Sequence, residues 1–101
     1  MKTNLRGQLV VFTGSLITMT RKEACHLVLS AKGNIANHVS KETNILVVGH
    51  YSKNLFDKEQ LTKKEKMAQL YQSEGFPIMT INEKQLLKYA IDDLKSKYTS
   101  I

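Results

Sequence analysis

The stretch Ile45-Leu46-Val47-Val48-Gly49 decides the fold of this 101-residue chain. Four apolar residues follow one another without polar alternation, and a glycine ends the run. Such a run is typical of a strand that is buried on both faces of a sheet. Similar short runs occur at residues 8–12 and 77–80. Because parallel sheets are covered by helices on both faces, these runs predict an α/β fold with a parallel sheet.

Helical patterns separate these strands, over residues 18–31, 62–73 and from Asn82 onward. The first two each open with a threonine and a glutamate at capping-box spacing, Thr20 with Glu23 and Thr62 with Glu65. Glycines end them, and we expect Gly33 to adopt the left-handed conformation. The predicted apolar stripes are Ala24, Leu27, Val28 and Ala31 in the first helix and Met67, Leu70 and Tyr71 in the second.

The last helix supplies an apolar face and completes the order β-α-β-β-α-β-α, in which residues 34–39 form a short, polar edge strand. The predicted face consists of Leu86, Leu87, Ala90, Ile91 and Leu94. We expect the first four of these to close the core against Leu27 and Val28. We also expect residues 95–101 to fray as a tail. The chain is thus predicted to be one domain over residues 1–101, with its core over 5–94.

Composition narrows the class of protein. The chain is 42% hydrophobic and 24% charged, which is ordinary for a soluble domain, and its formal net charge is +6. That charge favours a polyanionic partner such as nucleic acid, or it only keeps a small domain soluble; composition leaves both interpretations open. Cys25 is the only cysteine, so an internal disulfide is impossible, which suits the cytoplasm. No run is long and apolar enough to cross a membrane.

Motifs for catalysis are missing from the sequence. It has no nucleotide loop, no nucleophile elbow and no paired catalytic carboxylates, and its three histidines lack metal-ligand spacing. We therefore expect no enzyme activity, no cofactor and no metal.

The chain resembles the BRCT family over residues 5–94, because several weak motifs occur in family order and at family spacing. The motifs are Leu5-Arg6-Gly7, Val10-Val11-Phe12-Thr13-Gly14, Arg21-Lys22-Glu23-Ala24, Gly33, the Val-Ser-x-x-Thr-x-x-Leu-Val-x-Gly-like stretch at 39–49, Lys66-Met67-Ala68, and Gly75 with the Pro-Ile strand. Within the family the chain is similar to bacterial members, as in NAD-dependent DNA ligases or beside exonucleases, and to that of the clamp-loader large subunit. It departs from the family in having Gln85 where many members carry tryptophan.

The resemblance implies a four-stranded parallel sheet in the order 2-1-3-4. It also implies that the first and third helices lie on one face and the second on the other.

A phosphate site is predicted where the first strand ends. Thr13 and Gly14 lead from that strand into a loop, and ligands of open α/β sheets bind at such carboxyl ends. The Gly14 N–H can approach an anion closely, and the Thr13 hydroxyl can donate a hydrogen bond. Arg21 lies in the first turn of the next helix, where the helix dipole favours negative charge. In the alternative interpretation Thr13 and Gly14 only shape a turn, and Arg21 is an ordinary surface residue.

The resemblance adds a lysine to this site. Family members that hold a phosphate use the Thr-Gly pair and a helical lysine, and those that grip a recessed 5′-phosphate of duplex DNA also use an arginine at the place of Arg21. Alignment through Ala68 favours Lys64, followed by Lys63 and Lys66. Together with Lys58 these lysines form a basic stretch that lines a DNA backbone or is merely solvated.

Two functions remain as hypotheses. The first is a non-catalytic module of DNA replication or repair that binds DNA by recognising a phosphate at a 5′ end or nick. The second is a protein-interaction module that binds a phosphorylated peptide or docks a repair partner through the second helix. Either would act in the cytoplasm, on the nucleoid if the source is bacterial.

Overall fold

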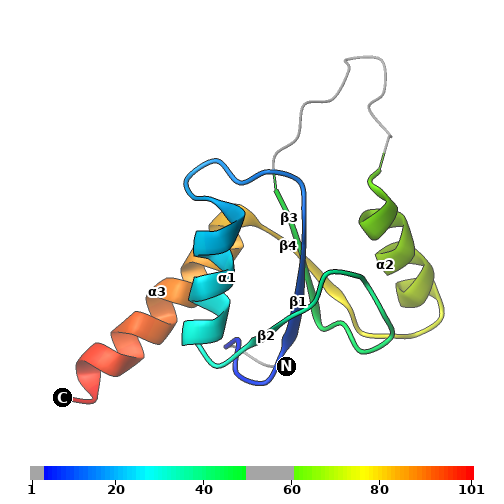
Figure 1. Ribbon diagram of the computed structural model, residues 1–101. Helices are drawn as coiled ribbons and strands as arrows, with labels where there is room; N and C mark the ends of the chain where they lie inside the picture. The colour runs from blue at the N-terminus through cyan, green and yellow to red at the C-terminus, as the bar shows by residue number, and fades with distance from the viewer. Residues whose placement is uncertain (1–3, 50–60) are drawn as a thin grey trace.

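The computed structural model describes residues 4–49 and 61–101. They form one parallel sheet of four strands in the order β2-β1-β3-β4 (Figure 1). The strands are β1 (Leu9–Thr13), β2 (Asn34–Ile35), β3 (Ile45–Val48) and β4 (Met79–Asn82). The predicted sheet and its strand order are confirmed, and β2 is an edge strand as expected.

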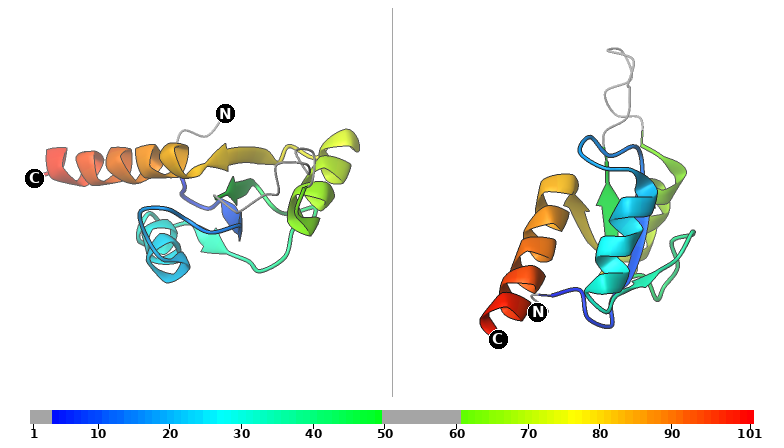
Figure 2. Two further views of the ribbon diagram at one scale, coloured as in Figure 1. Left: turned by 90° about the horizontal axis from the view of Figure 1, so that it is seen from above. Right: turned by 60° about the vertical axis from the view of Figure 1, so that its left-hand side comes forward.

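Three helices cover the two faces of the sheet. α1 (Arg21–Ser30) and α3 (Glu83–Thr99) lie on one face, and α2 (Lys63–Ser73) lies on the other, as Figures 1 and 2 show from different directions. This layering confirms the arrangement that the resemblance implied. No helix in the described ranges is long and apolar enough to span a bilayer.

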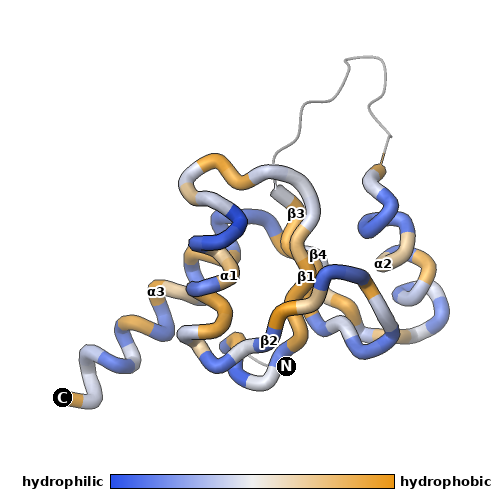
Figure 3. The backbone as a smooth tube through the Cα atoms, in the orientation of Figure 1, coloured by the Kyte–Doolittle hydropathy of each residue, from blue (hydrophilic) through white to orange (hydrophobic). Residues whose placement is uncertain are grey.

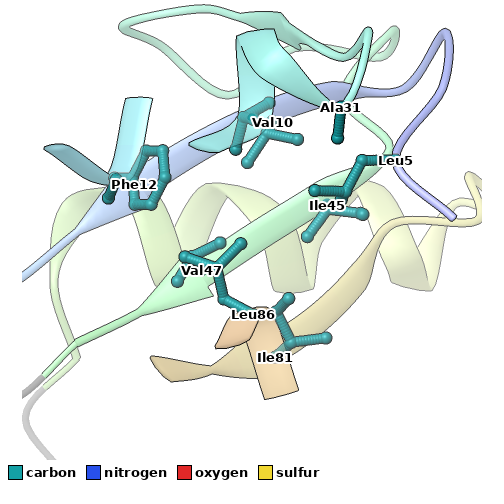
Figure 4. Close-up of a cluster of buried hydrophobic side chains, with 10 residues drawn as sticks. Leu5, Val10, Phe12, Ala31, Ile45, Val47, Ile81 and Leu86 are labelled. Atoms are coloured by element: carbon teal, nitrogen blue, oxygen red, sulfur yellow. The ribbon is translucent and has the colours of Figure 1, made fainter. Parts of the chain in front are cut away.

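The apolar runs lack polar alternation because successive side chains enter two separate cores. Figure 3 shows the hydrophobic colour following the central strands. Val10, Phe12 and Val47 point toward α1 and α3, where Val28 and Leu86 are fully buried (Figure 4). On the opposite face Val11, Leu46, Ala68 and Ile78 form a smaller core beneath α2.

Helix starts follow the predicted caps. Thr20, Thr62 and Asn82 each accept a bond from the backbone N–H three residues on, in complete capping boxes. The first helix therefore begins at Arg21 and not at residue 18. The strand bounds also differ from the prediction: β1 and β4 lie one to two residues later, and β2 has only two residues.

The role predicted for Gly33 is wrong. Lys32 adopts the left-handed conformation after α1, with φ of 70°. Gly33 is needed for space, because a Cβ there would lie 2.7 Å from Cγ1 of Val28 and 3.0 Å from the carbonyl oxygen of Leu5.

Two predicted helix faces are also wrong in part. In α2, Tyr71 packs against the core as predicted, whereas Met67 and Leu70 are exposed and Ala68 is buried in their place. In α3, Leu86 and Ala90 are buried as predicted, whereas Ile91 and Leu94 are exposed. The helix continues through Thr99, so the expected frayed tail is helical almost to its end.

Candidate functional site

The candidate site lies at the carboxyl edge of the sheet, where β1 and β3 end and where α1 and α2 begin (Figure 1, top). Thr13 is the last residue of β1, and Gly14 is the first residue of the loop that leads to α1. Gly14 has φ of 81°, a conformation that favours glycine. The edge thus brings together a glycine loop and two helix N-termini, which favour anions.

Thr13 is buried and connects β1 to α2. Its Oγ1 donates a 3.0 Å hydrogen bond to Oγ1 of Thr62, the N-cap of α2. Oγ1 of Thr62 in turn accepts a bond from the backbone N–H of Glu65, at 3.1 Å. The strand end and the start of α2 are therefore fixed relative to each other.

Arg21, the first residue of α1, folds back over the strand end. Its Nη2 donates a 2.7 Å hydrogen bond to the carbonyl oxygen of Gly14. Its Cζ lies 5.5 Å from the centroid of the Phe12 ring, within the range of a cation–π contact. The bond to Gly14 uses one of the five N–H donors of the guanidinium.

Lys64 reaches the same strand end from the opposite face of the sheet. Its Nζ donates a 2.7 Å hydrogen bond to the carbonyl oxygen of Phe12. Lys64 precedes the buried Ala68 by one helical turn, which places it on the sheet side of α2. Burial lowers the pKa of the Lys64 ammonium, and the nearby charge of Arg21 lowers this pKa further.

The two cations share a site without a counter-ion from the described residues. The ion pairs in these parts of the chain are Lys88–Asp92 and Lys97–Asp93, both within α3. Arg21 and Lys64 instead bond to backbone carbonyls on either side of Thr13. An edge with two cations, a hydroxyl and two helix N-termini is electrostatically suited to an anion.

The other lysines of the predicted basic stretch lie differently. Lys63 and Lys66 are exposed on α2, and Lys63 lines a shallow hollow with His38, Val39, Lys64 and Met67. Lys58 lies outside the described residues. Of the proposed lysines that the structure describes, Lys64 is therefore the one that lies at the strand end.

Sequence reasoning missed Glu83, which anchors the loop of the site. Its Oε1 accepts a 2.7 Å bond from the backbone N–H of Ile17, and its Oε2 accepts bonds from the backbone N–H and hydroxyl of Thr18 at 2.8 and 2.5 Å. The bond from Ile17, followed by those from Thr18, lowers the pKa of the Glu83 carboxyl. The sequence shows Glu83 only as an acidic residue in a first turn, and nothing local reveals a partner about 65 positions earlier.

Gly49, which the sequence indicated only as the end of a strand and as part of a family motif, is a second residue of the site. Its N–H donates a 2.8 Å bond to the carbonyl oxygen of Thr13. A Cβ at this position would lie 2.5 Å from the carbonyl oxygen of Ser15. The loop after β1 therefore crosses the end of β3 so closely that only glycine fits without a shift.

This arrangement supplies hydrogen-bond donors and positive charge, the chemistry of anion binding. In the described ranges no group of three or more histidine, cysteine, aspartate or glutamate side chains gathers in a way that could hold a metal ion.

Comparisons with known proteins find a matching family and several similar proteins. The family of the BRCA1 C Terminus (BRCT) domain matches residues 2–83. A DNA ligase of Carboxydothermus hydrogenoformans is 38% identical over 79 residues, which are 78% of this chain and 10% of the ligase. A DNA ligase of Prochlorococcus marinus is 33% identical over 85 residues, 84% of this chain and 10% of the ligase. The chain thus spans about a tenth of the length of these relatives.

Proposed function

The chain belongs to the BRCT family, and we propose that it is a non-catalytic binding module of DNA replication or repair. In this proposal it binds DNA by holding a phosphate, at a 5′ end or a nick, at the carboxyl end of β1. It needs no cofactor and acts in the cytoplasm, on the nucleoid if the source is bacterial.

One observation carries the proposal: Arg21 and Lys64 approach the Thr13–Gly14 end of β1 from opposite faces of the sheet. The four residues come from β1, its following loop, α1 and α2. Burial lowers the pKa of Lys64, and the charge of Arg21 lowers this pKa further, because two like charges held this close repel each other. A bound phosphate dianion would offset that repulsion. The two cations together should therefore bind a phosphate more tightly than either cation alone.

Each of the four residues has a distinct part in holding the phosphate. The Arg21 fork donates to two phosphate oxygens, and Lys64 supplies a point charge on the other side. The Gly14 N–H donates from the loop, where no side chain obstructs the approach. The Thr13 hydroxyl has a single proton, which it now gives to Thr62, so it must turn from Thr62 to donate to the phosphate.

Charge and similarity favour DNA as the source of the phosphate. The chain carries +6 formal charges, and the exposed Lys63 and Lys66 lie on the helix that holds Lys64. These two lysines contact the DNA backbone next to the held phosphate, which adds affinity without end preference. The similar proteins from C. hydrogenoformans and P. marinus are DNA ligases.

Protein interaction is the second candidate, and the exposed face of α2 favours it. Met67 and Leu70 are exposed there, although their spacing predicted a buried stripe. Next to Lys64, the hollow containing Val39 and Met67 could receive a side chain beside a phosphorylated residue. The same Thr13, Gly14, Arg21 and Lys64 would then hold the phosphate of a peptide.

A salt titration separates the two candidates. Affinity for a short duplex should fall steeply and linearly on a log–log plot against salt, because each neutralised DNA phosphate releases counter-ions. A phosphopeptide should compete weakly with the duplex. A phosphopeptide that bound tightly, with little salt dependence, and that displaced the duplex would assign the chain to protein interaction.

A further inference from the structure

The C-terminal half of α3 carries an apolar face that the domain leaves uncovered. Ile91, Leu94 and Tyr98 expose 57%, 59% and 80% of their surfaces. With the half-buried Leu87 before them and the exposed Ile101 after them, they form a row, here called the α3 row, with steps of four, three, four and three residues. Figures 1 and 2 show this end of α3 projecting past the other elements.

The α3 row is not needed to hold α3 on the domain. Leu86 and Ala90 already hold it there, since both side chains are buried. Farther along, Nζ of Lys97 donates to the carbonyl oxygen of Ser30 at the end of α1, at 3.3 Å. A row of exposed apolar residues beside these contacts marks a surface for interaction.

The spacing of the row indicates the shape of its partner. Steps of three and four residues keep side chains on one side of a helix. Two helices that pack together interdigitate their side chains with this same spacing. Because this end of α3 projects past the other elements, a second helix can lie along it and place its side chains between those of the row.

The charges beside the row indicate the chemistry of that helix. Lys84, Lys88 and Lys95 are exposed and lie along the border of the row that faces away from the sheet. Lys88 is paired with Asp92 at 2.9 Å, whereas Lys84 and Lys95 have no carboxylate partner in the described parts of the chain. A second copy of α3 packed antiparallel would set these lysines against themselves, which like-charge repulsion disfavours.

We propose that the α3 row docks an amphipathic helix that carries apolar residues at the same spacing and a border of carboxylates. The row extends toward the C-terminal end of α3, whereas the phosphate site lies at the N-terminal ends of α1 and α2. Both surfaces can be occupied at once, and the inference does not depend on the phosphate site.

Two synthetic helical peptides test this proposal. Both are about three heptads long with a leucine seam, and they differ only in carrying glutamates or lysines along the border. Fluorescence anisotropy with the whole chain should show the glutamate peptide binding at least about tenfold more tightly than the lysine peptide. Leu94→Ser should abolish that binding, and Lys95→Glu should reduce the preference for glutamate. The matched control is Leu29→Ser, an exposed leucine of α1, which should bind like the unaltered chain.

Several results would overturn the proposal. Equal binding of the two peptides, binding of neither, or binding that survives Leu94→Ser would each exclude a carboxylate-bordered helix on this face. A stable dimer of the chain alone, lost in Leu94→Ser, would assign the row to a second copy. Binding to vesicles with anionic lipid that Leu94→Ser removes, without peptide binding, would assign it to a membrane surface.

Discussion

Nζ of Lys64 lies 2.7 Å from the carbonyl oxygen of Phe12, and this bond joins the start of α2 to the end of β1. On the other side of Thr13, Arg21 bonds the carbonyl oxygen of Gly14 at the same distance. Two cations are thus held at one strand end by neutral carbonyls. Because both groups are positively charged, they repel each other.

The pKa of Lys64 should respond to both Arg21 and phosphate. Its pKa is lowered by burial and by the Arg21 charge, so Arg21→Gln should raise it toward the ordinary lysine value. A bound phosphate should raise it as well, because an adjacent anion favours the ammonium. NMR titration of the Lys64 side chain, free and with a 5′-phosphorylated duplex, measures both changes. A pKa unchanged by the duplex would mean that Lys64 does not contact the phosphate.

Glu83→Gln should loosen the loop of the site and change the acid side of the stability profile. The pKa of Glu83 is lowered in the folded chain, so the unfolded chain binds more protons at acid pH. The stability that Glu83 contributes is present at neutral pH and is lost as the pH falls through its folded pKa. Denaturant unfolding from neutral to acid pH should show that Glu83→Gln is less stable than the unaltered chain at pH 7. The free energy of unfolding of the variant should also change less as the pH falls.

Part of the acid dependence should remain in Glu83→Gln, because the pKa of Glu23 is also lowered by its bonds with Thr20. If Glu83→Gln matches the unaltered chain throughout, the carboxylate does not hold the loop. Amide chemical shifts of Ile17 and Thr18 provide a direct local check.

Leu86, and not Leu87, should be the core residue of α3. Leu86 is fully buried, so Leu86→Ala should cost about 2–5 kcal/mol of unfolding free energy. Leu87 is only partly buried, and the cost of Leu87→Ala should be clearly smaller. Denaturant unfolding of the two variants, with the exposed Ile91→Ala as a neutral reference, compares them. A larger loss for Leu87→Ala would contradict the orientation of α3.

Gly49→Ala should damage the site as well as the fold. The added Cβ would lie 2.5 Å from the backbone of Ser15, and the resulting shift should cost about 1–3 kcal/mol. Gly75→Ala is the matched control, because nothing lies within 4 Å there and only its φ of 96° resists alanine. Both should lower the thermal midpoint, but only Gly49→Ala should weaken binding of a phosphorylated duplex. Equal duplex binding by the two variants would show that the position of the loop after β1 does not affect binding of the phosphorylated duplex.

The sequence could predict the features of the fold that depend on local patterns. Apolar runs such as 45–48 predicted strands buried on both faces, and Thr62 with Glu65 predicted a capping box that is present. Helix rotation was harder to predict, because an apolar residue such as Leu94 fits a buried face and an exposed row equally well. Burial depends on which elements pack together, and that is a property of the assembled sheet.

The same division holds for the candidate site. Thr13, Gly14 and Arg21 could be proposed because a strand end, a loop and a helix start are neighbours in sequence. Lys64 needed alignment to the family, since the sheet brings it to Phe12 from 52 residues away. Glu83 carried no local signal at all, because its bonds to the loop exist only after β4 and α3 have assembled.

The most direct test of the account compares two duplexes with a recessed end, identical except for a 5′-phosphate or a 5′-hydroxyl. The unaltered chain should bind the phosphate duplex more tightly. Arg21→Ala and Lys64→Ala should each remove most of that preference, since a charge-assisted contact to a phosphate contributes about 1.5–3 kcal/mol. Lys66→Ala, an exposed lysine of the same helix, should weaken binding to both duplexes alike. Equal affinity of the unaltered chain for the phosphate and hydroxyl duplexes would contradict recognition of a 5′ end by Thr13, Gly14, Arg21 and Lys64.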